Sequence, residues 1–205
     1  MKLSVKPFPQ HPVRPSPTPT PTPTPAASLS GTVQGRLSPV SGAAVTLYAA
    51  GTAYGANATR LGGATTDSHA NFTVGYTPPA TPAVLYLLAL GGNAGSGSNT
   101  AVGLMGVAGM SNALPASVTI NELTTVAAEW ALAQFTNSMG QIIGAPASNA
   151  TGLTNAINLA QTNLVDITTG APAAFLGATA TSCGAGGSGP GNCATLEKMD
   201  TLANS

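Results

Sequence analysis

Few side chains in this chain have the types and spacing that catalysis requires. Asp67-Ser68-His69 contains the residue types of a nucleophilic triad, but consecutive side chains in a turn cannot align as nucleophile, base and orienting group. The carboxylates are no better placed, because Glu122 and Glu129 lie seven residues apart on one expected helix and Asp166 lies near the end of another. General acid–base catalysis needs two such groups to converge in a pocket. We therefore expect no catalytic residues, and we do not expect an enzyme.

Cys183 and Cys193 are the only cysteines, and they flank a glycine-rich stretch. Closing such a loop with a disulfide is geometrically easy, and an exported protein would favour it. A metal site needs further ligands, yet His11 lies in a proline-rich tail and His69 in a distant turn. We expect a disulfide in preference to a metal site, and no cofactor. Pairing of either cysteine with one in missing sequence is the alternative.

Charge is sparse and balanced, with six Lys and Arg against six Asp and Glu and a charged share of 6 %. Nucleic acids and anionic membranes are bound by clustered basic residues, which this chain lacks. The most apolar run, residues 83–90, has 8 residues, whereas a membrane helix needs roughly 20. We expect no nucleic-acid partner and no membrane span.

The N-terminal residues 1–27 are predicted to form a disordered linker rich in proline and threonine. Residues 17–25 alternate strictly between the two. Proline fixes φ and removes a donor, so this stretch should be an extended polyproline-II rod. Pro7 and Pro9 arrive before any apolar core that a secretion leader would need. We therefore expect that either the start is misassigned or the true leader is missing from this sequence.

Residues 28–110 carry the two-residue periodicity of half-buried strands. Strands are expected near 28–37, 44–49, 60–66, 71–76, 83–90 and 101–107. Turns rich in Gly, Pro, Asp and Asn separate them. Short strands at this spacing predict a β-sandwich, because a parallel sheet would need helices between them.

Three motifs in this region resemble the carboxypeptidase regulatory-like and collagen-adhesin B-type domains. They are Gly31-Thr32-Val33, Pro39-Val40-Ser41-Gly42-Ala43-Ala44-Val45 and Thr66-Asp67-Ser68-His69-Ala70-Asn71-Phe72. The resemblance implies an immunoglobulin/prealbumin-like β-sandwich, with Asp67 and Asn71 shaping a turn and no reaction attached. Ala70 stands where the family usually has glycine. If that position requires a positive φ, alanine costs about 1 kcal/mol there.

Beyond Ser111 the periodicity becomes helical, and residues 111–205 are predicted to form a helical segment with a glycine-rich Cys loop. Thr119 and Glu122 have the spacing of a capping box. Helices are expected at 120–137 and 152–165, and a third pattern begins at 194 and is cut short at the end of the sequence. Trp130 is assigned to the buried face of the first helix. Residues 121–130 resemble the segment that follows such β-domains in bacterial secreted proteins carrying NHL-type propellers.

These observations predict a non-enzymatic extracellular structural or interaction module of a larger bacterial secreted or surface protein. One alternative is a carbohydrate- or host-protein-binding domain of the adhesin type, acting through loops 51–60 and 91–100. Another is an accessory domain of an enzyme whose catalytic part is absent. The partner is a polysaccharide or another protein in the first alternative, and the sequence does not name it.

Overall fold

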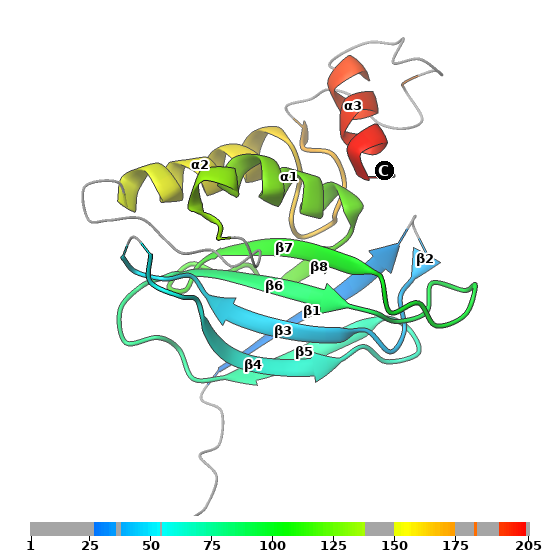
Figure 1. Cartoon of the computed structure of the whole chain (residues 1–205), viewed down its shortest axis with the longest axis horizontal. Helices are drawn as coiled ribbons and strands as arrows, with labels where there is room; N and C mark the ends of the chain where they lie inside the picture. Colours follow the sequence, from blue (N-terminus) through cyan, green and yellow to red (C-terminus); the bar gives the residue numbers. More distant parts are fainter. Residues whose placement is uncertain are drawn as a thin grey trace, which may run out of the picture.

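The computed structural model describes residues 27–35, 38–53, 55–137, 150–174, 183 and 193–203 (Figure 1). The predicted Pro/Thr-rich linker lies outside these residues, apart from Ala27, which begins the first strand. Residues 184–192, the loop between the two cysteines, also lie outside them.

Two sheets form the lower part of the molecule as seen in Figure 1. The strands are β1 (Ala27–Gly35), β2 (Ser38–Pro39), β3 (Ala44–Ala49), β4 (Thr59–Thr65), β5 (Asn71–Tyr76), β6 (Val84–Leu90), β7 (Gly103–Met110) and β8 (Ser117–Ile120). One sheet is antiparallel throughout, in the order β4-β3-β6-β7. In the other, β1 pairs with β5 and β2 antiparallel and with β8 parallel. The prediction of a mainly β chain, a sandwich with helices appended, is confirmed.

The core between the sheets follows from the alternation of side chains along each strand. Val45, Leu47 and Ala49 of β3 and Leu85, Leu87 and Ala89 of β6 point inward and are buried. From the opposite sheet, β5 contributes Phe72, Val74 and Tyr76. Because the chain is poor in aromatic residues, branched aliphatic side chains fill most of this space.

Glycine allows two close approaches between strands. A Cβ on Gly31 would collide with the carbonyl oxygen of Val118 in the neighbouring strand β8. A Cβ on Gly62 in β4 would lie 2.5 Å from the carbonyl oxygen of Gly75 in β5. Real Cβ atoms do not come this close to backbone, so the Gly31-Thr32-Val33 motif has a steric reason in this chain.

The helices are α1 (Glu122–Leu132), α2 (Ala150–Asn163) and α3 (Cys193–Ala203), and a 3₁₀ turn η1 (Ala133–Phe135) continues α1. Figure 1 shows α1 and α2 above β7 and β6. A second core cluster joins Tyr86, Met105 and Val107 of the sheet to Leu132 of α1 and Ile157 of α2. Helices α1 and α2 therefore cover the outer side of the β4-β3-β6-β7 sheet where β6 and β7 run.

Strand β8 lies beyond the predicted end of the sandwich. A helical segment was expected from residue 111, but Ser117–Ile120 pairs with β1, with Ser30 opposite Ser117 and Val33 opposite Ile120. The sandwich therefore extends to Ile120. Four residues directly before a helical pattern are too few for periodicity to reveal a strand.

The predicted capping box is wrong. Thr119 lies in β8, and its hydroxyl donates to the carbonyl oxygen of Thr168 at 2.9 Å. The N-cap of α1 is Asn121, whose Oδ1 accepts from the backbone N–H of Thr124 at 2.9 Å. The hydroxyl of Thr124 accepts in turn from the N–H of Asn121 at 2.9 Å. Glu122 is simply the first helical residue.

Asn121 also holds a distant loop, because its Nδ2 donates to the carbonyl oxygen of Gly170 at 2.8 Å. We expect Asn121→Ala to lower the free energy of unfolding by about 2 kcal/mol, since it removes a helix cap and leaves a buried carbonyl unpaired. Asn121→Ser keeps a capping oxygen and loses only the amide donor, so it should cost about 1 kcal/mol. Urea denaturation of the two variants checks this. Equal losses in the free energy of unfolding would contradict separate contributions from the helix cap and from the bond to Gly170.

Candidate functional site

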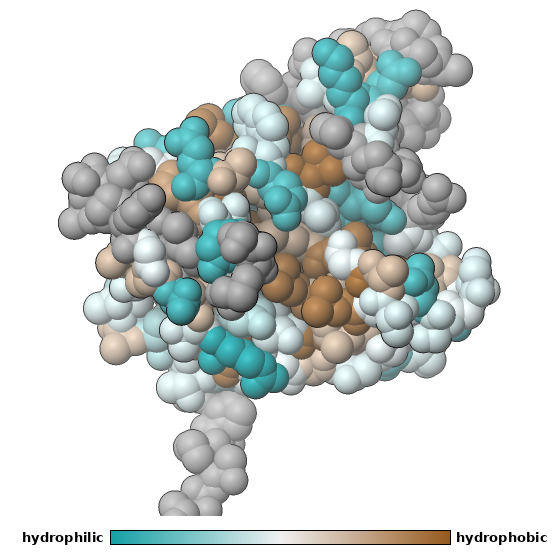
Figure 2. All heavy atoms as spheres, viewed as in Figure 1, coloured by the Kyte–Doolittle hydropathy of each residue, from teal (hydrophilic) through white to brown (hydrophobic). Residues whose placement is uncertain are grey.

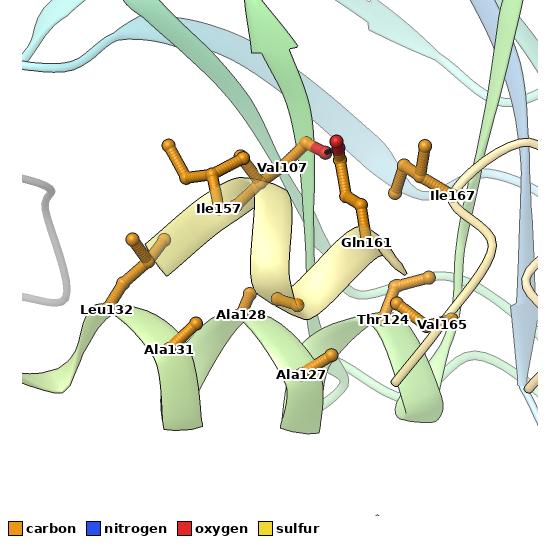
Figure 3. A pocket seen from close by; sticks show the side chains of 11 residues that line it. Val107, Thr124, Ala127, Ala128, Ala131, Leu132, Ile157, Gln161, Val165 and Ile167 are labelled. Carbon is orange, nitrogen blue, oxygen red and sulfur yellow. Dashed lines mark hydrogen bonds between the residues drawn. The ribbon is translucent and has the colours of Figure 1, made fainter. Parts of the chain in front are cut away.

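A small cavity lies between α1, α2 and β7 and has a volume of about 20 Å³ (Figure 3). Its walls are mostly apolar, and Gln161 reaches across it to donate from Nε2 to the carbonyl oxygen of Val107 at 2.9 Å. A cavity of this size holds about one water molecule. It is a packing feature of the helical layer and offers no space for a ligand.

A larger hollow opens between α1 and the beginning of β7, with a volume of about 530 Å³. We call it the α1–β7 groove, and its lining residues are Gly103, Leu104, Glu122, Thr125, Val126, Glu129 and Trp130. Ligand sites usually have volumes in this range and mostly apolar walls. Figure 2 shows hydrophobic side chains exposed between the helical layer and the strands.

Helix geometry explains how α1 lines this groove. Its five lining residues recur at intervals of three and four, which places them on one face of the helix. From Glu122 to Trp130 this stripe is about 12 Å long, because a helix rises 1.5 Å per residue. Val126 lies between the two ends, and Leu104 contributes from the strand. Leu104 is buried in the core between the sheets and Val126 is half-buried against the α3 cluster, so Trp130 contributes most of the exposed apolar surface of the groove.

Trp130 is 71 % exposed, so its predicted burial in the core is wrong. The face of α1 that packs inward consists of Thr124, Ala127, Ala128 and Leu132. Helical spacing identified an apolar stripe that included Trp130, but α1 packs through an adjacent face made mostly of small side chains. The only tryptophan of the chain therefore lines the groove.

The charges at the groove are negative. Glu122 is half-buried and Glu129 is exposed, and none of the lining residues that the structure describes is Lys, Arg or His. Glu129 directly precedes Trp130 at the same end of the stripe. An exposed indole beside a carboxylate can hold a ligand by stacking and by pairing with a cation or a hydroxyl group.

The Asp67 turn has the form that the sequence predicts. Oδ1 of Asp67 accepts from the backbone N–H groups of His69 and Asn71, both at 2.8 Å, and Asn71 then begins β5. The pKa of the Asp67 carboxyl is lowered, and the bond from the Asn71 N–H is the largest cause. Desolvation raises this pKa, and the bond from the His69 N–H lowers it further. Ala70 has a φ of 65°, so the position does require the left-handed conformation. Asp67 is occupied with backbone and does not orient His69 as a triad would.

Cys183 and Cys193 are joined in a disulfide, with their Cα atoms 5.5 Å apart. Cys193 is the first residue of α3 and is buried with Leu196 and Met199 against Ala127 of α1. The bridge therefore anchors the start of a helix that packs on α1.

The described residues contain no group of three or more His, Cys, Asp or Glu side chains arranged to hold a metal ion. No helix in the described part of the chain combines the length and hydropathy needed to cross a membrane.

Comparison with known proteins gives little. Neither a family model nor a curated protein matches the chain. Among solved structures, a 9R-lipoxygenase from Cyanothece is 14 % identical over a match that covers 46 % of this chain and 15 % of that chain, with a TM-score of 0.30. A likeness this weak supports neither a shared fold nor a shared activity.

The exposure of Trp130 leads to a stability prediction. Trp130→Ala should change the free energy of unfolding by less than about 0.5 kcal/mol, because little of the indole is packed. Leu132→Ala, on the same helix but only 1 % exposed, should cost about 2–5 kcal/mol. Urea denaturation of both variants checks this. A large loss in the free energy of unfolding for Trp130→Ala would contradict the exposed position of the indole.

The Asp67 turn predicts a pH dependence. The folded carboxyl has a pKa below the ordinary 3.8, so its contribution is complete above that value and disappears as the pH falls through the lower folded pKa. Asp67→Asn should therefore be less stable than the original chain at pH 7, and the gap should narrow below about pH 4.

Urea midpoints measured from pH 7 to pH 2 check this prediction. Ser68→Ala changes an exposed neighbour and neither Asp67 bond, so it should keep the original pH dependence. A gap between Asp67→Asn and the original chain that stays constant with pH would show that the carboxylate charge is not the source.

Proposed function

We propose that this chain is a non-enzymatic interaction module of a larger bacterial secreted or surface protein, and that it contacts its partner through the α1–β7 groove. The sandwich is the scaffold, and the helical layer provides the contact surface. The disulfide supports an extracellular location, because such bonds persist in oxidising compartments.

The strand order bears on the family that we propose. Apart from the two-residue strand β2, the first two strands are β1 and β3, and they lie in opposite sheets. A constant-type immunoglobulin domain keeps its first two strands in one sheet. We therefore propose the carboxypeptidase regulatory-like, prealbumin-like reading of the sequence motifs over the immunoglobulin one. The likeness of residues 121–130 to segments that precede NHL-type propellers remains part of the same proposal.

The observation that carries the function is the exposed indole of Trp130 in an open groove. Tryptophan offers a large apolar surface with one polar tip, and it is enriched at the energetic centres of binding surfaces. Here it adds nothing to the core. Its position is explained if the groove is occupied in the working protein.

A carbohydrate is the second candidate, and the same side chain favours it. An exposed indole can stack on a sugar ring, and the Glu129 carboxylate beside it can accept from sugar hydroxyls. This candidate shifts the binding surface from the predicted loops 51–60 and 91–100 to the helical layer. An accessory domain of an enzyme would use the groove in the same way.

A glycan array tests the carbohydrate candidate. The original chain should bind one class of glycan, and Trp130→Ala should lose at least about tenfold in affinity, as expected when a central aromatic contact is removed. Leu159→Ala is the control, because Leu159 is also an exposed large apolar side chain, at 56 %, but lies on α2 outside the groove. Binding that survives Trp130→Ala would exclude the groove, and no binding at all would exclude the carbohydrate.

A further inference from the structure

We propose that the α1–β7 groove is the docking site for the proline-rich stretch at residues 12–25 of the same chain, which contains Arg14 and precedes β1. The inference rests on the proposed function, because it names the partner of the same groove. It assigns the Pro/Thr-rich stretch a binding role as well as a spacer role.

The lining favours proline over sugar. Trp130 presents the exposed apolar surface, beside the half-buried Val126 and the buried Leu104. Proline-rich segments dock on aromatic-lined grooves because their extended conformation is already formed. A sugar would need several free polar groups. The Thr125 hydroxyl is already used, since it donates to the carbonyl oxygen of Asn121 at 2.7 Å and accepts from the N–H of Met105 at 2.8 Å.

Basic residues are concentrated before β1 and acidic residues after it, so the N-terminal stretch and the groove carry opposite charges. Three of the six basic residues, Lys2, Lys6 and Arg14, precede β1, whereas all six Asp and Glu residues follow it. Arg14 directly precedes Pro15 and the proline alternation. A guanidinium can stack on an indole and pair with a carboxylate at once. Trp130 and Glu129, neighbours at one end of the groove, provide those two partners.

The chain between Arg14 and β1 is long enough. Val33 lies opposite Ile120, two residues before α1, and Ala27 is six residues back along the strand, or about 20 Å. The 13 residues from Arg14 to Ala27 span about 40 Å when extended at 3.1 Å per residue. About four extended residues cover the 12 Å stripe of α1. Docking within one molecule is favoured because the tether provides an effective concentration near the millimolar range.

Fluorescence of Trp130, the only tryptophan, tests the docking in the full-length chain. Acrylamide should quench the original chain at least about twofold less than Arg14→Glu, because more than half of the tethered molecules should be docked. Arg60→Glu is the matched control, since it makes the same charge change on β4, outside the groove. It should keep the protection. Raising the salt to 1 M should weaken the protection in the original chain.

Adding a peptide and diluting the chain distinguish docking within one molecule from docking between two molecules. A synthetic peptide of residues 10–25 should restore protection to Arg14→Glu, and dilution of the original chain should leave its protection unchanged. Equal quenching of the original chain and Arg14→Glu would overturn the inference, and protection lost on dilution would assign the segment to a second copy and overturn docking within one molecule. If Trp130→Ala loses glycan binding and Arg14→Glu keeps it, the proposed function stands and this inference is overturned. If neither the peptide nor any glycan alters Trp130 emission, the proposed function itself fails.

Discussion

The buried side chain of Asn121 is the point on which the rest of the arrangement depends. It is 5 % exposed and lies where β8 ends and α1 begins. Its Oδ1 caps the helix, and its backbone N–H donates to the hydroxyl of Thr124. Its Nδ2 donates to the carbonyl oxygen of Gly170 in the loop after α2. The hydroxyl of Thr124 also donates to Met105 in β7 at 2.8 Å. Because buried polar groups need partners, this cluster fixes where α1 starts and how it lies on β7.

The direction of α1 then decides which of its faces is free. The face toward the sheet and α2 carries Ala127 and Ala128, whose small side chains let the helix lie close to its neighbours. The bulky indole of Trp130 is left on the outer face. The groove therefore forms because α1 packs on the edge strand β7 through a face of small side chains and leaves its bulky side chains outside. A rotation of α1 about its axis would bury Trp130 and close the hollow.

The sequence predicts the local features and misses those that depend on distant partners. Alternation places β3 and β5 at their observed bounds, and the Asp67 turn follows from bonds within four residues. Strand β8, by contrast, is stabilised by pairing with β1, some 87 residues away in the chain. The exposure of Trp130 is equally non-local, because it depends on which face of α1 the sheet covers. Periodicity reports that a face is apolar, and only packing decides whether it is covered.

Sparse charge gives the groove its electrostatic character. In an average protein about a quarter of the residues are charged, so an exposed glutamate has neighbours of both signs that offset its field. Here the share is 6 %, and no basic residue occurs among the described residues that line the groove. The carboxylate of Glu129 therefore acts on a ligand with little competition, next to the only indole. The proposed docking of the segment that contains Arg14 relies on this pairing of one carboxylate with one indole on a single surface.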